Sequence, residues 1–339
     1  MPHPADLRIT RVDPTDDLAL RDWYDVERGA MLLGREQMPH WSYEEMSTAW
    51  RRPDPGEDAR GYAAYADGRM VGGAVLYMPV LDNLDKCWLG VCVRPDDQHA
   101  GVGRALLSHV EAEAVAAGRT ELLAESKIPF AETTFHRHRR FAEQAGYGFS
   151  NIEVVRHLGL PVDEAELAGW TSGAAAKHEG YRIETHVNAM PEHLLASLCV
   201  LHGQLGVDAP TGEAEWEEEQ ITPERYLANL DSLVAAGRTI YETVAIAPDG
   251  TVAAQTTMSV PPPGRTDVSQ WGTFVHREHR GHRLGLAVKA ANLRAVQDAH
   301  PQMRRVVTQN AETNQWMIAI NEQIGFAPVE ASMEFIKRI

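Results

Sequence analysis

The chain has 339 residues with 44% apolar content, enough for two ordinary domains with sizeable cores. Its formal net charge of -16 argues against nucleic acid or an anionic membrane as the main partner, because both would be repelled. Such a charge would attract a cationic small molecule, and its commoner meaning is a solvated acidic surface. Three cysteines are too few for a disulfide framework, and the start of the chain lacks the pattern of a secretory signal, so we expect a cytoplasmic protein without a membrane span.

Elements of the first half follow from hydrophobic spacing and turn residues. Alternation predicts an edge strand at 7–13, and helical spacing runs from 16 to 50 with an interruption at Pro39. The Asp67-Gly68 pair predicts a hairpin turn. The other predicted elements are a hairpin at 61–80, strands at 85–95, 120–126 and 149–160, and helices at 102–117 and 132–145, each ended by a glycine.

A polar segment rich in glycine and alanine, 161–178, separates the halves and is interpreted as a linker with a short helix. Domains are therefore expected at 1–160 and 179–339. Strands alternating with helices after an initial meander predict an α/β (α+β) fold with a mixed sheet in each half. The second half repeats the order, with strands at 181–187, 240–247, 252–260, 268–275, 305–310 and 327–338 and helices at 191–205, 223–236, 284–299 and 313–324.

The order is repeated because the sequence itself repeats. The turn at Asp67-Gly68 recurs as Asp249-Gly250, 182 positions later. The same offset relates Val93 to Val275, Gln98 to Arg280 and Gly103 to Gly285. Near the end of each half, "FAEQAGYG" at 141–148 matches "INEQIGFA" at 320–327 with an offset of 179, a difference that a loop absorbs.

The repeated loop has the composition of a phosphate site. An apolar strand ends at Val93, a polar loop follows, and Gly101 and Gly103 lead into a helix. First-turn amides of a helix have no internal partner, and glycine lets an anion approach them, while Gln98 can donate to phosphate oxygens. The absence of Gly-Lys-Ser/Thr argues against a nucleotide P-loop. The alternative is that the glycines serve only close packing of the strand and the helix.

The pattern Val-x-Pro-x-x-Gln-x-x-Gly-x-Gly followed by Ala-Leu-Leu, at 93–107, resembles the acyl-CoA pyrophosphate loop of the GNAT N-acetyltransferase superfamily. Because both halves share the resemblance, the chain is similar to tandem GNAT proteins such as the mycothiol-synthase-like actinobacterial acetyltransferases. The resemblance implies two tandem GNAT folds, each a mixed, mostly antiparallel sheet flanked by helices, and acetyl-CoA as cosubstrate.

Residues expected at the cofactor are carried over from the resemblance. Arg283 stands where the first loop has Gly101: with ordinary helical torsions it offers its amide and its guanidinium to phosphate, or its bulk closes the site. Asn314 matches an asparagine that the family places against the pantetheine arm. The implied cofactor residues are Val93, Gln98, Gly101, Val102, Gly103 and Arg104 in the first half and Val275, Arg280, Arg283, Leu284, Gly285 and Asn314 in the second.

Acyl transfer to an amine needs a base, a donor for the thioester oxygen and an acid for the leaving thiolate. The resemblance implies a backbone donor from strand 89–93 or 272–275. Family members commonly use a tyrosine acid at positions that hold Ala142 and Asn321 here, so Asn321 is a candidate for binding the sulfur or a water. Glu125, at a strand end, is the candidate base, with a plain surface carboxylate as the alternative.

Other polar clusters have weaker interpretations. His276, His279 and His282 recur every three residues, but a loop does not fix them on one face, so we expect no metal site and regard them as candidate proton acceptors. The basic run 136–140 and the acidic stretch 213–219 are interpreted as solvated surface; their alternatives are sites for cofactor phosphate and for a cation.

These observations predict an acyl-CoA-dependent N-acetyltransferase, monomeric or homodimeric, that acetylates a primary amine of a small molecule by direct attack. The alternative is a non-catalytic acyl-CoA- or ligand-binding protein built from degenerate GNAT domains, which the missing tyrosines favour. Asn314 favours the second half as the catalytic one.

Overall fold

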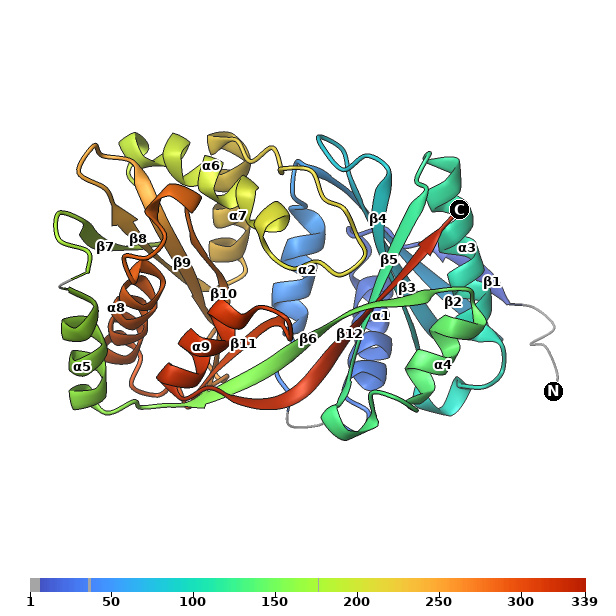
Figure 1. Ribbon diagram of the computed structural model, residues 1–339. Helices are drawn as coiled ribbons and strands as arrows, with labels where there is room; N and C mark the ends of the chain where they lie inside the picture. Colours follow the sequence, from blue (N-terminus) through green and yellow to red (C-terminus); the bar gives the residue numbers. More distant parts are fainter. Residues whose placement is uncertain (1–6, 36–37, 176) are drawn as a thin grey trace. The chain divides into compact units, whose positions relative to one another are not determined.

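The computed structural model of the chain describes residues 7–35, 38–175 and 177–339, which divide into two compact units (Figure 1). Unit 1 comprises the chain up to Ser126 with 134–150 and 333–339. Unit 2 comprises 127–133 and 151–332. The units therefore differ from two consecutive halves of the chain, because the last strand of each half is divided between them.

Unit 1 has a mixed sheet in the order β1-β2-β3-β4-β5, with the end of β12 beside β5. Its strands pair antiparallel from β1 to β4, and β4 pairs parallel with β5. Its elements are β1 (Arg8–Arg11), α1 (Asp17–Met31), α2 (Tyr43–Arg51), β2 (Glu57–Ala66), β3 (Arg69–Pro79), β4 (Lys86–Val93), α3 (Val102–Ala116), β5 (Glu121–Pro129), α4 (Arg137–Gln144), the start of β6 (Gly148–Gly159) and the end of β12 (Ala327–Arg338).

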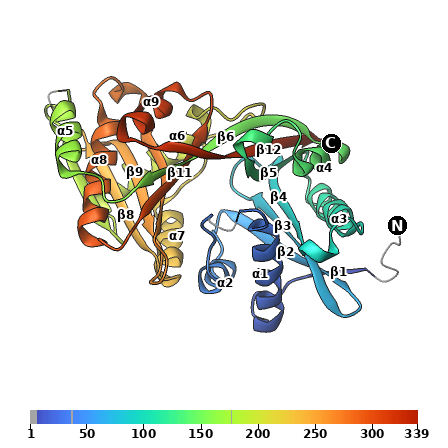
Figure 2. The same ribbon diagram turned by 90° about the horizontal axis from the view of Figure 1, so that it is seen from below.

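Helices cover both faces of this sheet (Figure 2). A side chain at Gly73 would meet Trp23 of α1, whereas one at the neighbouring Gly72 would meet Val102 and Leu106 of α3. Since successive strand residues point to opposite faces, α1 and α3 lie on opposite sides. The glycines of β3 thus allow both helices to pack close to the sheet.

Unit 2 repeats the plan with the strand order β6-β11-β10-β9-β8-β7, and the first part of β12 lies beside β6. The pairing of β10 with β11 is parallel, and the pairs β7–β8, β8–β9, β9–β10 and β6–β11 are antiparallel. Its elements are α5 (Glu164–Ala175), β7 (Arg182–Val187), α6 (Glu192–Asp208), α7 (Pro223–Ala235), β8 (Thr239–Ile246), β9 (Val252–Val260), β10 (Asp267–Val275), α8 (Leu284–Ala299), β11 (Arg305–Ala311), α9 (Gln315–Ile324) and most of β6 and β12.

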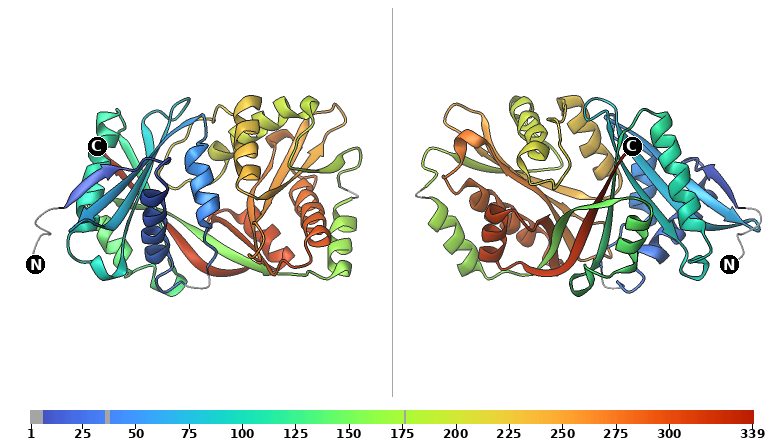
Figure 3. Two further views of the ribbon diagram at one scale, coloured as in Figure 1. Left: turned by 180° about the vertical axis from the view of Figure 1, so that it is seen from behind. Right: turned by 45° about the vertical axis from the view of Figure 1, so that its right-hand side comes forward.

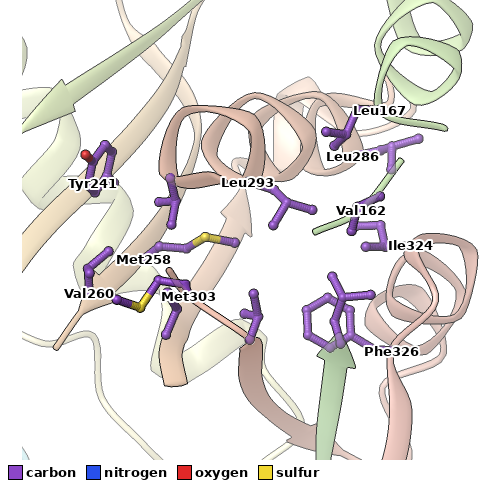
Figure 4. Close-up of a cluster of buried hydrophobic side chains, with 14 residues drawn as sticks. Val162, Leu167, Tyr241, Met258, Val260, Leu286, Leu293, Met303, Ile324 and Phe326 are labelled. Carbon is purple, nitrogen blue, oxygen red and sulfur yellow. The ribbon is translucent and has the colours of Figure 1, made fainter. Parts of the chain in front are cut away.

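The central strands of unit 2, β8 and β9, are buried on both faces. Helices lie on both sides of them (Figure 3). Val244 and Ile246 of β8 pack in the cluster that contains residues of α6, and Ala245 and Ala247 pack in the cluster that contains Leu284 of α8. A further apolar cluster joins β9, α8 and α9 (Figure 4). The predicted mixed, mostly antiparallel sheet flanked by helices is confirmed in both units.

The segment expected to be a linker, 161–178, contains α5, a helix of 12 residues that packs against α8. Asp163 caps the first turn of α5 at Ala165, with a distance of 2.8 Å between Oδ1 and the amide nitrogen. Leu167 is fully buried among Leu286 and Leu293 of α8. In unit 1, the helix expected at 132–145 begins only at Arg137, because His136 caps it.

Candidate functional site

Each unit opens its sheet at one place. The parallel pair β4–β5 is in register over only three residues, ending at Trp88 opposite Leu123. The parallel pair β10–β11 is likewise in register over three, ending at Ser269 opposite Val307. Beyond these points the paired strands diverge, and the loops that follow β4 and β10 lead into α3 and α8. The predicted cofactor residues therefore lie at equivalent positions in the two units.

The first loop presents an uncapped helix end. Gln98 donates from Nε2 to the carbonyl oxygen of Val93 at 3.2 Å, which closes the loop. His99 and Gly101 both have positive φ, 64° and 90°, and a side chain added at Gly101 would meet nothing within 4 Å. No side chain caps α3, whose first internal bond runs from Ala105 to Gly101. The three preceding amides are therefore available to an anion.

The second loop has the same backbone with the glycine moved. Arg280 donates from Nε to the carbonyl oxygen of Val275 at 3.3 Å, as Gln98 does to Val93. The two residues with positive φ are Gly281, at 87°, and Arg283, at 54°. The ordinary helical torsions expected for Arg283 are wrong, because it is the left-handed residue that precedes α8. The amides that follow Arg283 are placed as in the first loop.

The side chains of the second loop are held by neighbouring elements. Asp208, at the end of α6, pairs with both Arg277 and Arg280, and its Oδ2 lies 2.5 Å from Arg280 Nη2. The hydrogen bond from Arg277, followed by that from Arg280, lowers the pKa of Asp208. Arg283 Nη1 donates to the carbonyl oxygen of Gly173 in α5 at 3.3 Å, so its guanidinium points to α5.

The three loop histidines do not converge. His279 Nδ1 lies 2.9 Å from the Tyr181 hydroxyl, and His282 Nδ1 lies 3.0 Å from the Lys177 carbonyl oxygen, whereas His276 accepts from the Glu278 amide. Over 7–35, 38–175 and 177–339, no group of three or more His, Cys, Asp or Glu side chains is arranged to hold a metal ion.

The second glycine of each loop brings helix and strand together. A side chain at Gly103 would lie 3.5 Å from Val93 and 3.7 Å from Phe141. One at Gly285 would lie 3.5 Å from Val275 and 3.2 Å from Ile320. These glycines serve close packing, the alternative considered from the sequence, and they do so beside the helix amides.

In unit 1, α4 contributes polar groups beside the first loop. Arg137 Nη1 donates to Gln98 Oε1 at 3.3 Å, so part of the basic run 136–140 contacts the loop. His138 Nδ1 lies 2.7 Å from Ser126 Oγ on β5, and burial lowers the pKa of His138 to about 4. The imidazole is therefore neutral near pH 7. Glu125, the candidate base, is an exposed residue on the part of β5 beyond its pairing with β4.

Asn314 and Asn321 both have structural partners. Asn314 caps α9 by accepting from the Met317 amide at 3.1 Å. Asn321 is 1% exposed; its Oδ1 accepts from Lys289 Nζ at 3.0 Å, and its Nδ2 donates to Asn310 Oδ1 at 3.0 Å. The roles expected for these asparagines, at pantetheine and at sulfur, stay predictions.

Lys289 was missed by sequence reasoning, although a single lysine in the apolar run of α8 was a visible signal. Its side chain is fully buried, and this burial lowers its pKa to about 7. Asn310 Oδ1 also accepts from Arg156 Nη1 at 3.2 Å, which extends the buried polar network to β6.

The strand before the loop differs between the units. The register of β4 with β3 is regular from Trp88 to Val93. The register of β10 with β9 shifts between Gln270 and Thr273, which places a bulge at Trp271 and Gly272. Bulges leave residues outside the ladder. Of the two predicted oxyanion strands, 89–93 and 272–275, only the second follows such a bulge.

The first loop also meets the physical requirements of a diphosphate. Amides precede the first internal bond of α3, open space lies above Gly101, and Arg137 brings a cation to Gln98. In the second loop Asp208 pairs with Arg280, and the Arg283 guanidinium bonds the Gly173 carbonyl oxygen. The residues of the first loop fit the diphosphate of an acyl-CoA. In the parts of the chain that the structure describes, no helix is both long and apolar enough to cross a bilayer.

Comparisons with known proteins agree with this geometry. Residues 57–147 match the family model of the acetyltransferase (GNAT) domain, and no curated protein matches the chain. A solved tandem GNAT protein from the clavulanic acid biosynthesis pathway, without acetyl-CoA, is 26% identical, with a TM-score of 0.79 and 98% of each chain covered.

Two more distant structures share the fold. A GCN5-related N-acetyltransferase from Sphaerobacter thermophilus is 17% identical, with a TM-score of 0.62, and the match covers 100% of this chain and 96% of that one. An N-myristoyltransferase from Saccharomyces cerevisiae with bound myristoyl-CoA is 12% identical, with a TM-score of 0.60, and the match covers 100% of this chain and 80% of that one.

Residues 57–147 thus match the GNAT acetyltransferase domain, and the mixed sheet and the loop of this domain recur in unit 2. Because the likeness to the tandem protein extends over 98% of the chain, the chain has the tandem GNAT fold. The fold is one that supports acyl transfer from an acyl-CoA.

Proposed function

We propose that the protein transfers an acetyl group from acetyl-CoA to a primary amine of a small molecule by direct attack on the thioester. The observation that carries this proposal is the uncapped N-terminus of α3, where Gly101 leaves open space before three amides without internal partners. Such an end binds a diphosphate. It follows a strand that diverges from its parallel neighbour, so the thioester would extend into the opening.

In this proposal the residues of each loop share the work. Gln98 and the amides of Val102, Gly103 and Arg104 hold the diphosphate in unit 1. Their counterparts in unit 2 are Arg280, Arg283, Leu284 and Gly285. A backbone amide of the strand before the loop donates to the thioester oxygen as charge develops on it. Glu125 is the proposed base of unit 1, and Asn321 is proposed to act near the sulfur in unit 2.

A second candidate function is acyl-CoA binding without turnover. One observation favours it: Ala142 and Asn321 provide no phenol at the position of the usual acid, and the Asn321 amide is already bonded to Lys289 and Asn310. A water then has to protonate the thiolate, or no transfer occurs.

A thiol-release assay with acetyl-CoA and a panel of primary amines separates the two functions. Release that depends on one amine supports the transferase. Saturable acetyl-CoA binding by calorimetry, with no release above buffer for any amine, supports the binding protein. Absence of both acetyl-CoA binding and release would overturn both.

A further inference from the structure

Unit 2 contains a polar cluster that none of the assignments above uses. We call His202, Tyr226, Glu242, Gln255 and Thr257 the Glu242 cluster; they come from α6, α7, β8 and β9. We propose that the Glu242 cluster binds the ammonium group of a small-molecule amine and accepts its proton. The catalytic part of this inference rests on the proposed function; the binding part does not.

Glu242 is a buried carboxylate with one oxygen satisfied and one not. Its residue is 3% exposed, and Oε2 accepts from the Thr257 hydroxyl at 2.7 Å, across the register pair of β8 and β9. Oε1 is buried and has no hydrogen-bond partner within the described residues. Burying an unpaired carboxylate oxygen is costly. A bound donor at Oε1 would remove that cost.

His202 lies beside this oxygen without a hydrogen bond to it. Its Nε2 lies 3.5 Å from Glu242 Oε1, and like that oxygen it has no hydrogen-bond partner in the described chain. The His202 side chain is 24% exposed and tilts against the Tyr226 ring, with 5.7 Å between centroids. An amine entering beside the imidazole would therefore meet an aromatic wall and a carboxylate, the combination that suits an alkylammonium.

Gln255 connects the cluster to the bulge of β10. It is completely buried, and its Nε2 has no partner among the residues described. A side chain at Gly272 would lie 3.5 Å from that nitrogen and 2.9 Å from Leu205. The glycine thus keeps the space between Gln255 and the bulge clear. This places the Glu242 cluster beside the strand proposed to hold the thioester oxygen.

The charge around the cluster favours a cation. The acidic stretch 213–219 reaches α6 at its last residue, where the Glu219 amide donates to the Gly203 carbonyl oxygen at 3.1 Å. A side chain at Gly203 would approach the Glu219 carbonyl oxygen to 2.4 Å, so only glycine admits this contact next to His202. Five glutamates in this stretch raise the local concentration of amines and repel carboxylates.

The proton balance of transfer can be written for these groups. An ammonium loses two protons when it becomes an amide nitrogen. The first goes to Glu242 Oε1, the nitrogen then bonds to the carbonyl carbon, and the carbon–sulfur bond breaks. The second proton goes to the departing thiolate, which leaves as the thiol. Glu242 returns its proton to water by way of His202.

The test uses n-butylammonium chloride as the probe and the His202 ring resonance as the readout, assigned by comparison with His202→Gln. Sodium chloride at equal ionic strength and 1-butanol are the matched additives. We expect a saturable shift by about 100 mM n-butylammonium, as befits a small fragment, and little change with either control. Glu242→Gln, which keeps the size of the side chain, should weaken this binding at least tenfold.

Glu27→Gln is the control variant, because Glu27 and His40 form a similar carboxylate–imidazole pair, 3.4 Å apart, in unit 1. It should bind the probe as the wild type does. The proposal is overturned if the wild type shows no saturable shift, if 1-butanol shifts the resonance equally, or if folded Glu242→Gln retains full binding.

Thiol release distinguishes this inference from the proposed function. Release by the wild type that persists undiminished in Glu242→Gln would contradict the catalytic role of Glu242 and leave the transferase standing. Probe binding that depends on Glu242, with no release for any amine, would contradict the transferase and leave the ammonium site standing.

Discussion

Unit 1 places Leu107 and Ala142 where unit 2 places Lys289 and Asn321. The two pairs are related by the offsets of the repeat, 182 and 179 positions. Leu107 is a buried apolar residue of α3, whereas Lys289 is buried at the same turn of α8 and donates to Asn321. The same architecture therefore tolerates either an apolar contact or a charged and an amide side chain at one point of its core.

Ala142 and Asn321 occupy the position expected for a tyrosine acid, and the two units fill this position in different ways. In unit 2 the position is tied into a buried network through Lys289 and Asn310, while in unit 1 a methyl group fills it. A buried lysine that keeps only an amide acceptor lowers stability. The network thus lowers the free energy of unfolding, and the first substitution below measures by how much.

The largest effect is expected when the pair of unit 1 is moved into unit 2, as Lys289→Leu with Asn321→Ala. The folded pKa of Lys289, about 7, lies below its usual value of 10.5. The unfolded chain therefore binds more protons between these pH values, and wild-type stability rises with pH by up to about 1.4 kcal/mol per unit. The variant lacks this rise.

We expect the variant to be more stable than the wild type at pH 7, by up to about 4 kcal/mol, and the gap to close toward pH 10. Urea unfolding at several pH values measures this. The single variant Asn321→Ala serves as control, since it leaves Lys289 buried. A gap that does not change with pH would contradict a neutralised lysine.

A negative charge introduced at the second glycine of each loop should show which loop binds acetyl-CoA. Gly103→Glu places a carboxylate beside the α3 amides and should weaken acetyl-CoA binding at unit 1 about 100-fold, because like charges repel at short range. Gly285→Glu should do the same at unit 2. Calorimetry then counts the remaining sites.

Ala116→Glu adds the same charge at the exposed far end of α3 and should leave binding unchanged. Full affinity and stoichiometry in both glutamate variants would show that neither helix end holds the diphosphate.

A smaller effect on acetyl-CoA affinity is expected when Asp208, which pairs with Arg277 and Arg280 of the second loop, is replaced. Asp208→Asn releases Arg277 and Arg280 for an anion, and acetyl-CoA affinity at unit 2 should rise about fivefold at low salt, since each exposed ion pair is worth about 1 kcal/mol or less. Titration with Gly103→Glu as background isolates unit 2. A fall in affinity would mean that Asp208 instead orients Arg280 for the phosphate.

The smallest effect concerns the exchanged left-handed residues. Gly101→Arg should destabilise unit 1 by about 1 kcal/mol, because the space is open and only the backbone is strained. Arg283→Gly should change stability by less, since relief of strain offsets the lost bond to Gly173. Urea midpoints compare the two. Equal losses from both substitutions would contradict the offset.

Local patterns in the sequence predicted much of this molecule. The hairpin at Asp67-Gly68, the loop before α3 and the strand 327–338 depend on neighbouring residues, and they were found where expected. The 182-residue offset related Gln98 to Arg280, and the two side chains do make equivalent bonds to the carbonyl oxygens of Val93 and Val275. The mixed sheet followed from the order of the elements, and the tandem arrangement followed from the repeat.

The remaining features depend on contacts between distant residues. The left-handed Arg283 accompanies a bond to α5, which was expected to be mainly a linker. The burial of Lys289 and Glu242 results from the packing of α8 and β8 against other elements, and their sequence neighbours only hint at it. Strand pairing likewise places the residues of β6 from Asn151 onward in unit 2 and the residues of β12 from Met333 onward in unit 1.

The division of β12 between the units has a consequence for how the chain folds during synthesis. Arg338 pairs with Glu121 and Lys337 with Glu111, both in unit 1, so residues from late in the sequence complete the sheet of the earlier unit. The sheet of unit 1 is incomplete until residues 333–339 have been synthesised, and a copy truncated before them would expose the edge of β5 to aggregation. Unit 1 therefore cannot complete its sheet from the first half of the chain alone.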